Sequence, residues 1–417
     1  MSTIKLSQMT LLNSATERRC RISLACTNFA LADVRDGLMP FMAIYLMTVH
    51  DWKQGQIGTV IAIMSICGLL AQTPMGALVD STSRKRLLLS TAAIIVALSS
   101  LSLVFFPTFW PVAISKGILG AVASVFAPAI AAITLGIWGQ SGFTAQIGRN
   151  EAFNHGGNVF SALVAGVLGY TLGMQWAFYF VAFSALVSVI TINWIPGKAI
   201  DNERARGLTE ANEKQGDKPS GFATLFESKP LLIFSLCILL FHFANAAMLP
   251  LVSEKLSKAD SDHASLYVSA CVVLAQLVMI PMAILVGRKA DTWGRKPIFL
   301  VGFLILPIRG VLFTLSDYPF YLMSVQVLDG IGAGIFGALF PIVIADLTRG
   351  TGRYNVAQGA VFTLMGIGVA LSNLIAGYVA EFAGFSAAFY FLAAVAGTAL
   401  ALLWFAMPET LNFESEK

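Results

Sequence analysis

Long apolar runs alternate with short polar connections along the whole chain. Each run holds about 20 mainly apolar residues, the length at which a helix crosses the hydrocarbon core of a bilayer. The runs lie at 23–48, 55–79, 85–106, 109–138, 152–173 and 176–195, and then at 230–252, 264–286, 297–315, 320–346, 356–379 and 386–407. The pattern predicts an all-α membrane protein with twelve transmembrane helices.

Composition agrees with that prediction and limits what else the chain holds. Hydrophobic residues make up 57% of the sequence and charged residues 12%, about half the charged fraction of an ordinary soluble domain. The longest polar stretch, 197–229, is too short for a catalytic domain and is predicted to be a cytoplasmic linker. The predicted domains are an N-terminal six-helix bundle at 1–196, this linker, and a C-terminal six-helix bundle at 230–417.

A ten-residue motif occurs twice, in matching positions between apolar runs. It occupies Gly76–Lys85 and Gly287–Lys296, so the copies are 211 residues apart in a chain of 417. The offset is not confined to the motif, because Ala177–Phe180 recurs unchanged as Ala388–Phe391. The repeat predicts two pseudo-symmetric bundles that face each other across a cavity at the bilayer midplane.

Lys and Arg are concentrated in alternate connections. If the N-terminus is inside, 21 cations lie on the internal side, against only Lys53, Lys255 and Lys258 outside. Because cytoplasmic loops carry such an excess of cations, we expect a multi-pass protein of the inner (cytoplasmic) membrane with both termini in the cytoplasm. The net charge of +4 reflects this topology and gives no support for nucleic-acid binding.

The motif has a physical role that follows from its position at helix ends. An aspartate there can lie against the positive N-terminus of a neighbouring helix, and adjacent cations can pair with acids across the interface between halves. Such contacts would hold the cytoplasmic side shut. The competing interpretation is that the cations only fix the topology.

The motif also carries a family resemblance. The chain resembles the major facilitator superfamily, whose signature Gly-x-x-x-Asp-x-x-Gly-Arg-Lys is complete in the second copy and departs at Ser83 in the first. Lys116 and Gly120 are similar to a family pattern in the fourth helix, and a narrower likeness is to bacterial permeases of siderophore or drug type. The glycine-proline pattern of antiporters is absent from the fifth helix. The resemblance implies a cytoplasmic gate formed by Gly76, Asp80, Arg84, Lys85, Gly287, Asp291, Arg295 and Lys296.

Three ionisable residues, Asp33, Arg35 and Asp36, lie in the first predicted helix. Each costs roughly 3 kcal/mol or more at the bilayer centre, so it persists mainly where it faces protein or a wet cavity. Helical geometry turns Arg35 away from Asp33. Either the carboxylates face the cavity, where one could carry a coupling proton, and Arg35 pairs with another helix, or the reverse holds. A static ion pair is the competing interpretation.

The fifth predicted helix carries a polar stripe of Glu151, Asn154, His155 and Asn158 at the spacing of one helical face. Such a stripe in a membrane span is expected to look inward. Glu151 and Arg149 are near enough to the cytoplasmic end to be gate residues, whereas His155 and Asn158 reach deeper and could touch substrate or relay a proton. Interhelical hydrogen bonding is the alternative.

The remaining pathway candidates are buried polar residues of the other helices. Lys116 and Asp329 have opposite charge and could pair across the cavity in one conformation. Arg309 is expected to snorkel outward. The C-terminal candidates are His242, Asn245, Gln326, Asp329, Asn355 and Gln358.

These features predict a secondary active transporter that moves a small polar organic solute by alternating access, coupled to protons. The alternatives are a proton-driven drug or siderophore exporter and, in a different class, a non-transporting membrane receptor. No phosphate-binding loop, nucleophile motif or metal-spaced ligand set is present, and the five cysteines are scattered. We therefore expect no enzyme activity, no cofactor and no metal. The expected partners are the solute, protons and the lipid bilayer, and we expect a monomer.

Overall fold

The computed structural model describes residues 14–36, 42, 45, 46, 49–52, 54–207, 225, 228–259 and 264–411. Within these ranges the side chains of Asp33, Arg35 and Asp36 lie outside the described part. Residues 208–224, which make up most of the predicted linker, also lie outside the described part.

Helices account for nearly all of the described chain. The first half contains α1 (Ser14–Asp36), α3 (Gln54–Ser81), α4 (Lys85–Phe105), α5 (Phe109–Ala123), α6 (Phe126–Thr171), α7 (Gln175–Asn193) and the short 3-10 turns η1 (Gly197–Ala199) and η2 (Arg204–Arg206). The second half contains α8 (Lys229–Asn245), α9 (Met248–Ala259), α10 (Ala264–Trp293), α11 (Arg295–Leu312), α12 (Pro319–Leu347), α13 (Tyr354–Ala383) and α14 (Phe385–Ala406).

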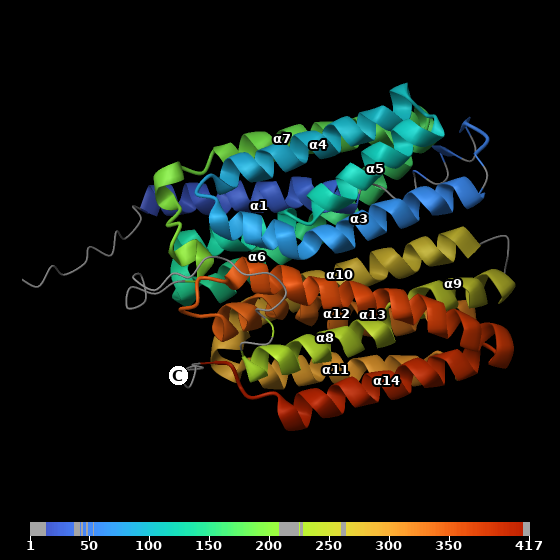
Figure 1. Ribbon diagram of the computed structural model, residues 1–417. Helices are drawn as coiled ribbons and strands as arrows, with labels where there is room; N and C mark the ends of the chain where they lie inside the picture. The colour runs from blue at the N-terminus through green and yellow to red at the C-terminus, as the bar shows by residue number, and fades with distance from the viewer. Residues whose placement is uncertain are drawn as a thin grey trace, which may run out of the picture.

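The helices form two bundles that lie side by side. Figure 1 shows α1 and α3–α7 in one bundle and α8–α14 in the other, with α6 and α10 adjacent at the middle. One buried apolar cluster lies almost wholly in the second bundle, and two others lie within the first. Each bundle therefore has its own core, as expected of two homologous halves.

Among the described residues, nine helical stretches are long and apolar enough to cross a membrane. One of them, Phe109–Gly169, is 61 residues long and bends at Gly139, where φ is 60°. That bend separates the predicted spans 109–138 and 152–173. The fold is the predicted all-α membrane fold, and the count of twelve spans stays a prediction.

Several predicted helix boundaries differ from the structure: the predicted span 109–138 is divided between α5 and α6, the span 230–252 is divided between α8 and α9, and α10 ends at Trp293 rather than at 286. Two predicted starts also differ. The first helix begins at Ser14 rather than at 23, and the helix after the Gly139 bend begins well before 152. Both extensions are polar, because they carry residues that bond to protein at the end of the bundle instead of facing lipid. A hydropathy pattern detects the lipid-crossing part of a helix and leaves out such ends.

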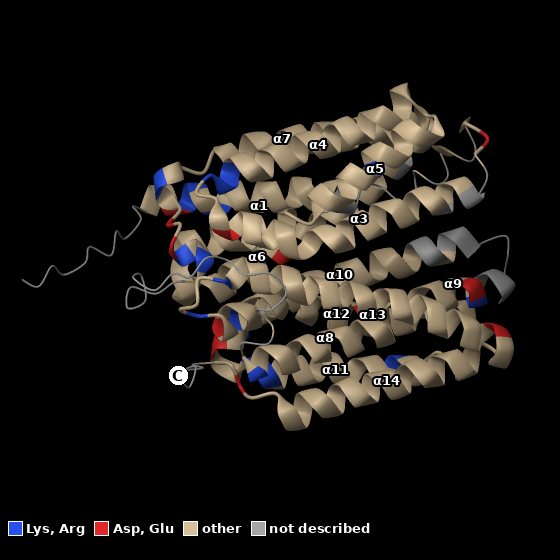
Figure 2. Cartoon of the chain, in the orientation of Figure 1, with Lys and Arg blue, Asp and Glu red and all other residues tan. Residues whose placement is uncertain are grey.

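Lys and Arg gather at one end of the two bundles, the end at which α3 and α10 finish and α4 and α11 begin (Figure 2). We call it the basic end and the opposite end the far end.

Candidate functional site

One contact between the halves joins the basic end of α3 to the start of α13. We call it the first junction. Asp80 is 2% exposed, and its carboxylate accepts hydrogen bonds from the Asn355 side-chain amide at 2.6 Å and from the Val356 backbone N–H at 2.8 Å. The Asn355 backbone N–H lies at 3.4 Å. These groups open α13, where free N–H groups and the helix dipole favour a negative charge. The motif aspartate therefore lies against a helix N-terminus of the other half, as its sequence position predicted.

The second junction joins the basic end of α10 to α6. Asp291 accepts a hydrogen bond from Thr144 Oγ1 at 2.9 Å and pairs with Arg295 at 2.6 Å. The Asp291 side chain is 46% exposed, so solvent weakens its interactions more than those of the buried Asp80. The first junction is therefore the stronger of the two.

The sequence repeat relates the two junctions. Asp80 and Asp291 are 211 positions apart, and so are their partners, Thr144 and Asn355. Each half thus supplies one aspartate and one partner. This is the arrangement expected when two homologous bundles close on each other about a pseudo-twofold axis.

Glycines allow the halves to touch at both junctions. A Cβ added at Gly148 would lie 2.6 Å from the Cα of Gly287, and one at Gly76 would overlap the backbone carbonyl of Asn355. No flexible side chain is available to move aside there, since the obstructing atoms are backbone. Small residues at such crossings let membrane helices approach closely, so these glycines are a condition for the closed basic end.

The motif cations Lys85 and Arg295 bond mainly within their own halves, although the Arg295 guanidinium also lies 3.5 Å from Thr144 Oγ1 of α6. Arg295 is 5% exposed and pairs with Asp346 of α12 at 3.0 Å, while Glu409 accepts from the Arg295 backbone N–H at 2.9 Å. Lys85 is 1% exposed and its ammonium donates to the Thr82 carbonyl at 2.8 Å. The expectation that these cations pair with acids across the interface is wrong for both, because the acids that pair with Arg295 belong to its own half and the Lys85 ammonium donates to a carbonyl of its own half.

The other predicted gate cations do not contact an acid of the opposite half among the described residues. Arg84 is exposed. Lys296 donates its backbone N–H to Glu409 at 3.1 Å, and Arg149 lies over the Phe153 ring at 5.8 Å.

Deeper in the protein, His155 and Gln276 connect α6 to α10. His155 Nδ1 and the Gln276 side-chain oxygen are 2.7 Å apart, and His155 is 8% exposed. Its Nε2 is buried without a hydrogen-bond partner among the described residues. Glu151 lies on the same helix close to Gly337 of α12. The polar stripe of the fifth predicted helix therefore faces the other half, with Asn154 buried and Asn158 half-buried.

Lys116 and Gln326 occupy related positions in the two halves and are both buried. Lys116 is 1% exposed and Gln326 0%. Both side-chain amide atoms of Gln326 lack a hydrogen-bond partner among the described residues. No described acid pairs with Lys116. Buried polar groups without partners are unusual and mark places where water, an ion or a ligand can bind.

The expected outward snorkelling of Arg309 is wrong. Arg309 is 2% exposed, and its guanidinium forms an ion pair with Asp329 of α12. In this structure Asp329 therefore pairs with Arg309 and not with Lys116. Ionisable residues within membrane spans commonly face the bundle interior and pair with one another, as Arg309 and Asp329 do.

The remaining candidates are distributed through the two bundles. His242 is packed edge-on against Phe336 at 4.7 Å, and its Nδ1 lies 3.1 Å from the Ile238 carbonyl. Gln358 is 2% exposed and Asn245 is half-buried, whereas Asn355 belongs to the first junction. The predicted contacts of Asp33, Arg35 and Asp36 fall outside the described residues.

Several polar residues, two at the interface and one within α6, were not predicted. Thr144 forms the hydrogen bond that joins α6 to Asp291 at the second junction, and Gln276 is the partner of His155 across the halves. Asn150 is 0% exposed and bonds to Gln146 at 2.9 Å and to Thr134 at 3.0 Å. The repeat contained a signal for Thr144, because it stands 211 positions before Asn355. No sequence signal identified the partners of Asn150.

Replacing Gln276 by leucine should favour the open basic end. The substitution removes the bond to His155 that crosses the halves, and one such bond contributes about 1 kcal/mol, a shift of roughly fivefold in the closed-to-open ratio. The measurement is the distance distribution between spin labels at Ser83 and Thr292, two exposed positions of opposite halves, called the basic-end label pair. Gln72→Leu serves as the control, and an equal shift in both variants would contradict the expectation.

Comparison with known proteins places the chain in a family. Its sequence matches the family model described as Major Facilitator Superfamily over residues 24–306 and 231–416. An uncharacterized MFS-type transporter of Mycobacterium tuberculosis (strain ATCC 25618 / H37Rv) is 49% identical over 398 residues, 95% of each chain. The fold is similar to that of the transporter FucP in its outward conformation (TM-score 0.73, 14% identity, 92% of this chain and 97% of that one). It is also similar to the human organic anion transporter MFSD10 (TM-score 0.70, 17% identity, 93% and 99%). The chain belongs to the major facilitator superfamily.

Proposed function

We propose that this member of the superfamily is a proton-coupled secondary active transporter that moves a small polar organic solute by alternating access. The basic end would face the cytoplasm, in the inner membrane of the cell. The arrangement of residues described above is the closed state of that end. Transport would require the two junctions to break and the far end to close in turn.

The observation that carries this proposal is the pair of junctions related by the repeat. Contacts that are worth a few kcal/mol in one state and absent in another set the balance between two conformations. The first junction is a buried carboxylate with three N–H donors, so it favours closure strongly. Its loss on opening must be offset by solute or proton binding elsewhere, which is how binding would be coupled to movement.

The orientation rests on charge. Cations gather at the end that carries both junctions, and an excess of Lys and Arg is retained on the cytoplasmic side during membrane insertion. The junctions would then form the inner gate.

The solute is proposed to bind between the halves near the buried polar groups. His155 and Gln326 supply a base and an amide with unsatisfied hydrogen-bonding capacity among the described residues, and Lys116 supplies a buried cation. Groups of this kind suit a polar or zwitterionic solute that carries a carboxylate. They do not suit a purely apolar one, because the unpaired groups would stay desolvated.

Flux in proteoliposomes tests the proposal. Candidate solutes come from metabolites that accumulate or disappear in a deletion strain, and each is tested with and without an imposed pH gradient. Solute flux that follows the pH gradient supports coupled transport, and its sign tells uptake from export. Absence of flux for every solute that the deletion affects would contradict the proposal and favour the non-transporting receptor.

Lys116→Gln should lower the flux of a carboxylate-bearing solute by about tenfold, because one charge-assisted hydrogen bond is lost. The variant should fold, since glutamine stands at the related position 326 and the substitution removes a buried charge that no described acid pairs with. The control is Lys255→Gln, which removes the lysine that holds the Phe313 carbonyl at 2.7 Å. That control should lower thermal stability without selective loss of carboxylate flux. Equal flux in wild type and Lys116→Gln would exclude Lys116 from the solute site.

A further inference from the structure

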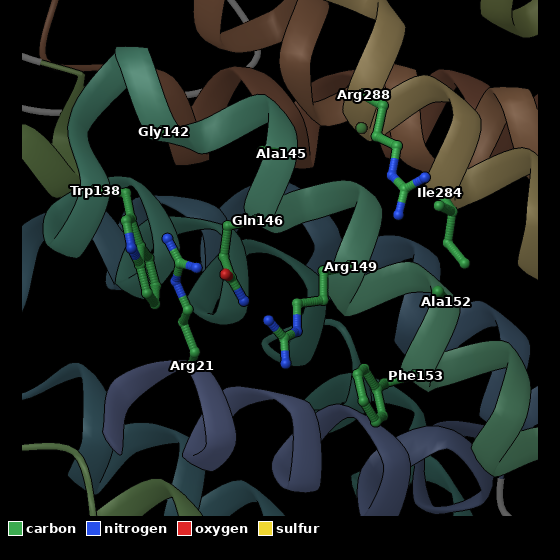
Figure 3. Close-up of a pocket in the computed structure, with 11 residues that line it drawn as sticks. Arg21, Trp138, Gly142, Ala145, Gln146, Arg149, Ala152, Phe153, Ile284 and Arg288 are labelled. Atoms are coloured by element: carbon green, nitrogen blue, oxygen red, sulfur yellow. The ribbon is translucent and has the colours of Figure 1, made fainter. Parts of the chain in front are cut away.

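A cavity of about 470 Å³ opens between α1, α6 and α10 at the basic end. Figure 3 shows the guanidinium groups of Arg21 and Arg149 between α1 and α6, and that of Arg288 reaching from α10 toward α6. Gly287 also lines the cavity, and it touches Gly148 of the other half. The cavity is therefore shared by the two halves and exists in this form only while they are in contact.

The charge of this cavity is one-sided. Three guanidinium groups line it, and no acidic side chain does among the described residues. Arg21 pairs with Glu17 at 2.6 Å, but both side chains are substantially exposed, so the pair contributes little. Arg149 lies over the Phe153 ring at 5.8 Å. Cations that line one cavity repel one another unless an anion neutralises them.

The remaining lining residues define the kind of anion. Guanidinium groups bind phosphate through paired N–H donors in a planar geometry. Gln146, whose side chain is 4% exposed, adds a fixed amide beside Arg21 (Figure 3). Exposed Phe153 and Ile284 provide an apolar border. We propose that this cavity binds a phosphate group, supplied either by the head group of an anionic phospholipid or by a soluble phosphate compound.

Such binding would stabilise the closed basic end. A phosphate held by Arg149 of one half and Arg288 of the other binds the closed state more tightly than the open one, because opening separates the two guanidinium groups. A ligand shifts a conformational equilibrium by its difference in affinity for the two states. The cavity is thus a regulatory site that is separate from the proposed solute site.

The test compares lipid and soluble sources of phosphate. The purified full-length protein is placed in vesicles of pure phosphatidylcholine and in vesicles in which part of that lipid is phosphatidylglycerol, and inorganic phosphate is added to the first set. The basic-end label pair reports closure, and native mass spectrometry reports retained lipid. Closure by phosphatidylglycerol alone assigns a lipid head group. Closure by inorganic phosphate in phosphatidylcholine assigns a soluble compound.

The double variant Arg149→Gln/Arg288→Gln should lose about tenfold or more of the ligand response. The matched control is Lys289→Gln, which removes one cation from the same end, at a residue that lies over Trp293 at 5.6 Å and does not line the cavity. It should respond as the wild type does. The proposal is overturned if neither source closes the basic end, or if the double variant and the control respond equally. Closure and lipid retention are both measured without transport. A failure of the phosphate-site proposal can therefore be distinguished from a failure of the proposed transport function.

Discussion

Replacing Gly148 by leucine is expected to hold the basic end open and to abolish most transport. A Cβ at this position would lie 2.5 Å from the Ala283 carbonyl oxygen and 2.8 Å from the Gly287 backbone nitrogen. Neither can move without shifting α10. Overpacking of this kind costs about 2 kcal/mol or more, so the closed-to-open ratio should fall by roughly 30-fold or more. The open state has no such contact and bears no cost.

The basic-end label pair measures this change, in a chain whose five native cysteines are replaced. Gly397→Leu is the matched control, because a Cβ at Gly397 of α14 meets nothing within 4 Å. The control should keep the wild-type distance distribution. Thermal unfolding shows whether each variant folds, and Gly359→Ala, which also places a Cβ against backbone of the other half, tests the same point with a smaller side chain. A closed basic end in folded Gly148→Leu would contradict the account.

Asp80→Asn should have the second largest effect. The amide nitrogen would replace one carboxylate oxygen with a donor that faces the N–H groups of either Asn355 or Val356, which now supply bonds at 2.6 and 2.8 Å to the two oxygens. Losing a hydrogen bond to a charged group costs about 2 kcal/mol, a factor of roughly 30 in the population of the closed state. Flux should fall, because a cycle needs both states.

Asp291→Asn provides the comparison within the protein. Its carboxylate is half exposed, so the same substitution should shift the basic-end label pair several-fold less. Asp317→Asn, an exposed acid that pairs with Lys255 at the far end, should not shift it. An effect of Asp291→Asn as large as that of Asp80→Asn would show that burial does not decide the strength of the junctions.

The sequence repeat predicted the two bundles and the place of Asp80 because both depend on local pattern. Apolar length determines a span, and a motif aspartate at a helix end has few partners other than a neighbouring helix N-terminus. Asn355 and Thr144 are separated by the same offset of 211, so the repeat relates the partner of Asp291 to the partner of Asp80.

Other pairings could not be predicted, because they depend on how each helix is rotated about its axis. Arg309 and Asp329 meet across α11 and α12, and His155 meets Gln276 across α6 and α10. Helical periodicity gives the face that a residue occupies and leaves open which helix lies opposite. The extension of α6 toward the Gly139 bend was not predicted because it is polar. Its polar side chains form hydrogen bonds to other protein groups, which a hydropathy pattern does not detect.

The most direct test measures both ends of the molecule at once. Spin labels at Ser83 and Thr292 report the basic end, and labels at Phe106 and Leu315, each 63% exposed, report the far end. Distances are recorded in proteoliposomes at acidic and neutral pH, with and without a transported solute. Alternating access predicts that the two distances change in opposite directions, one shortening as the other lengthens. Two distances that stay fixed in every condition, or that lengthen together, would contradict it.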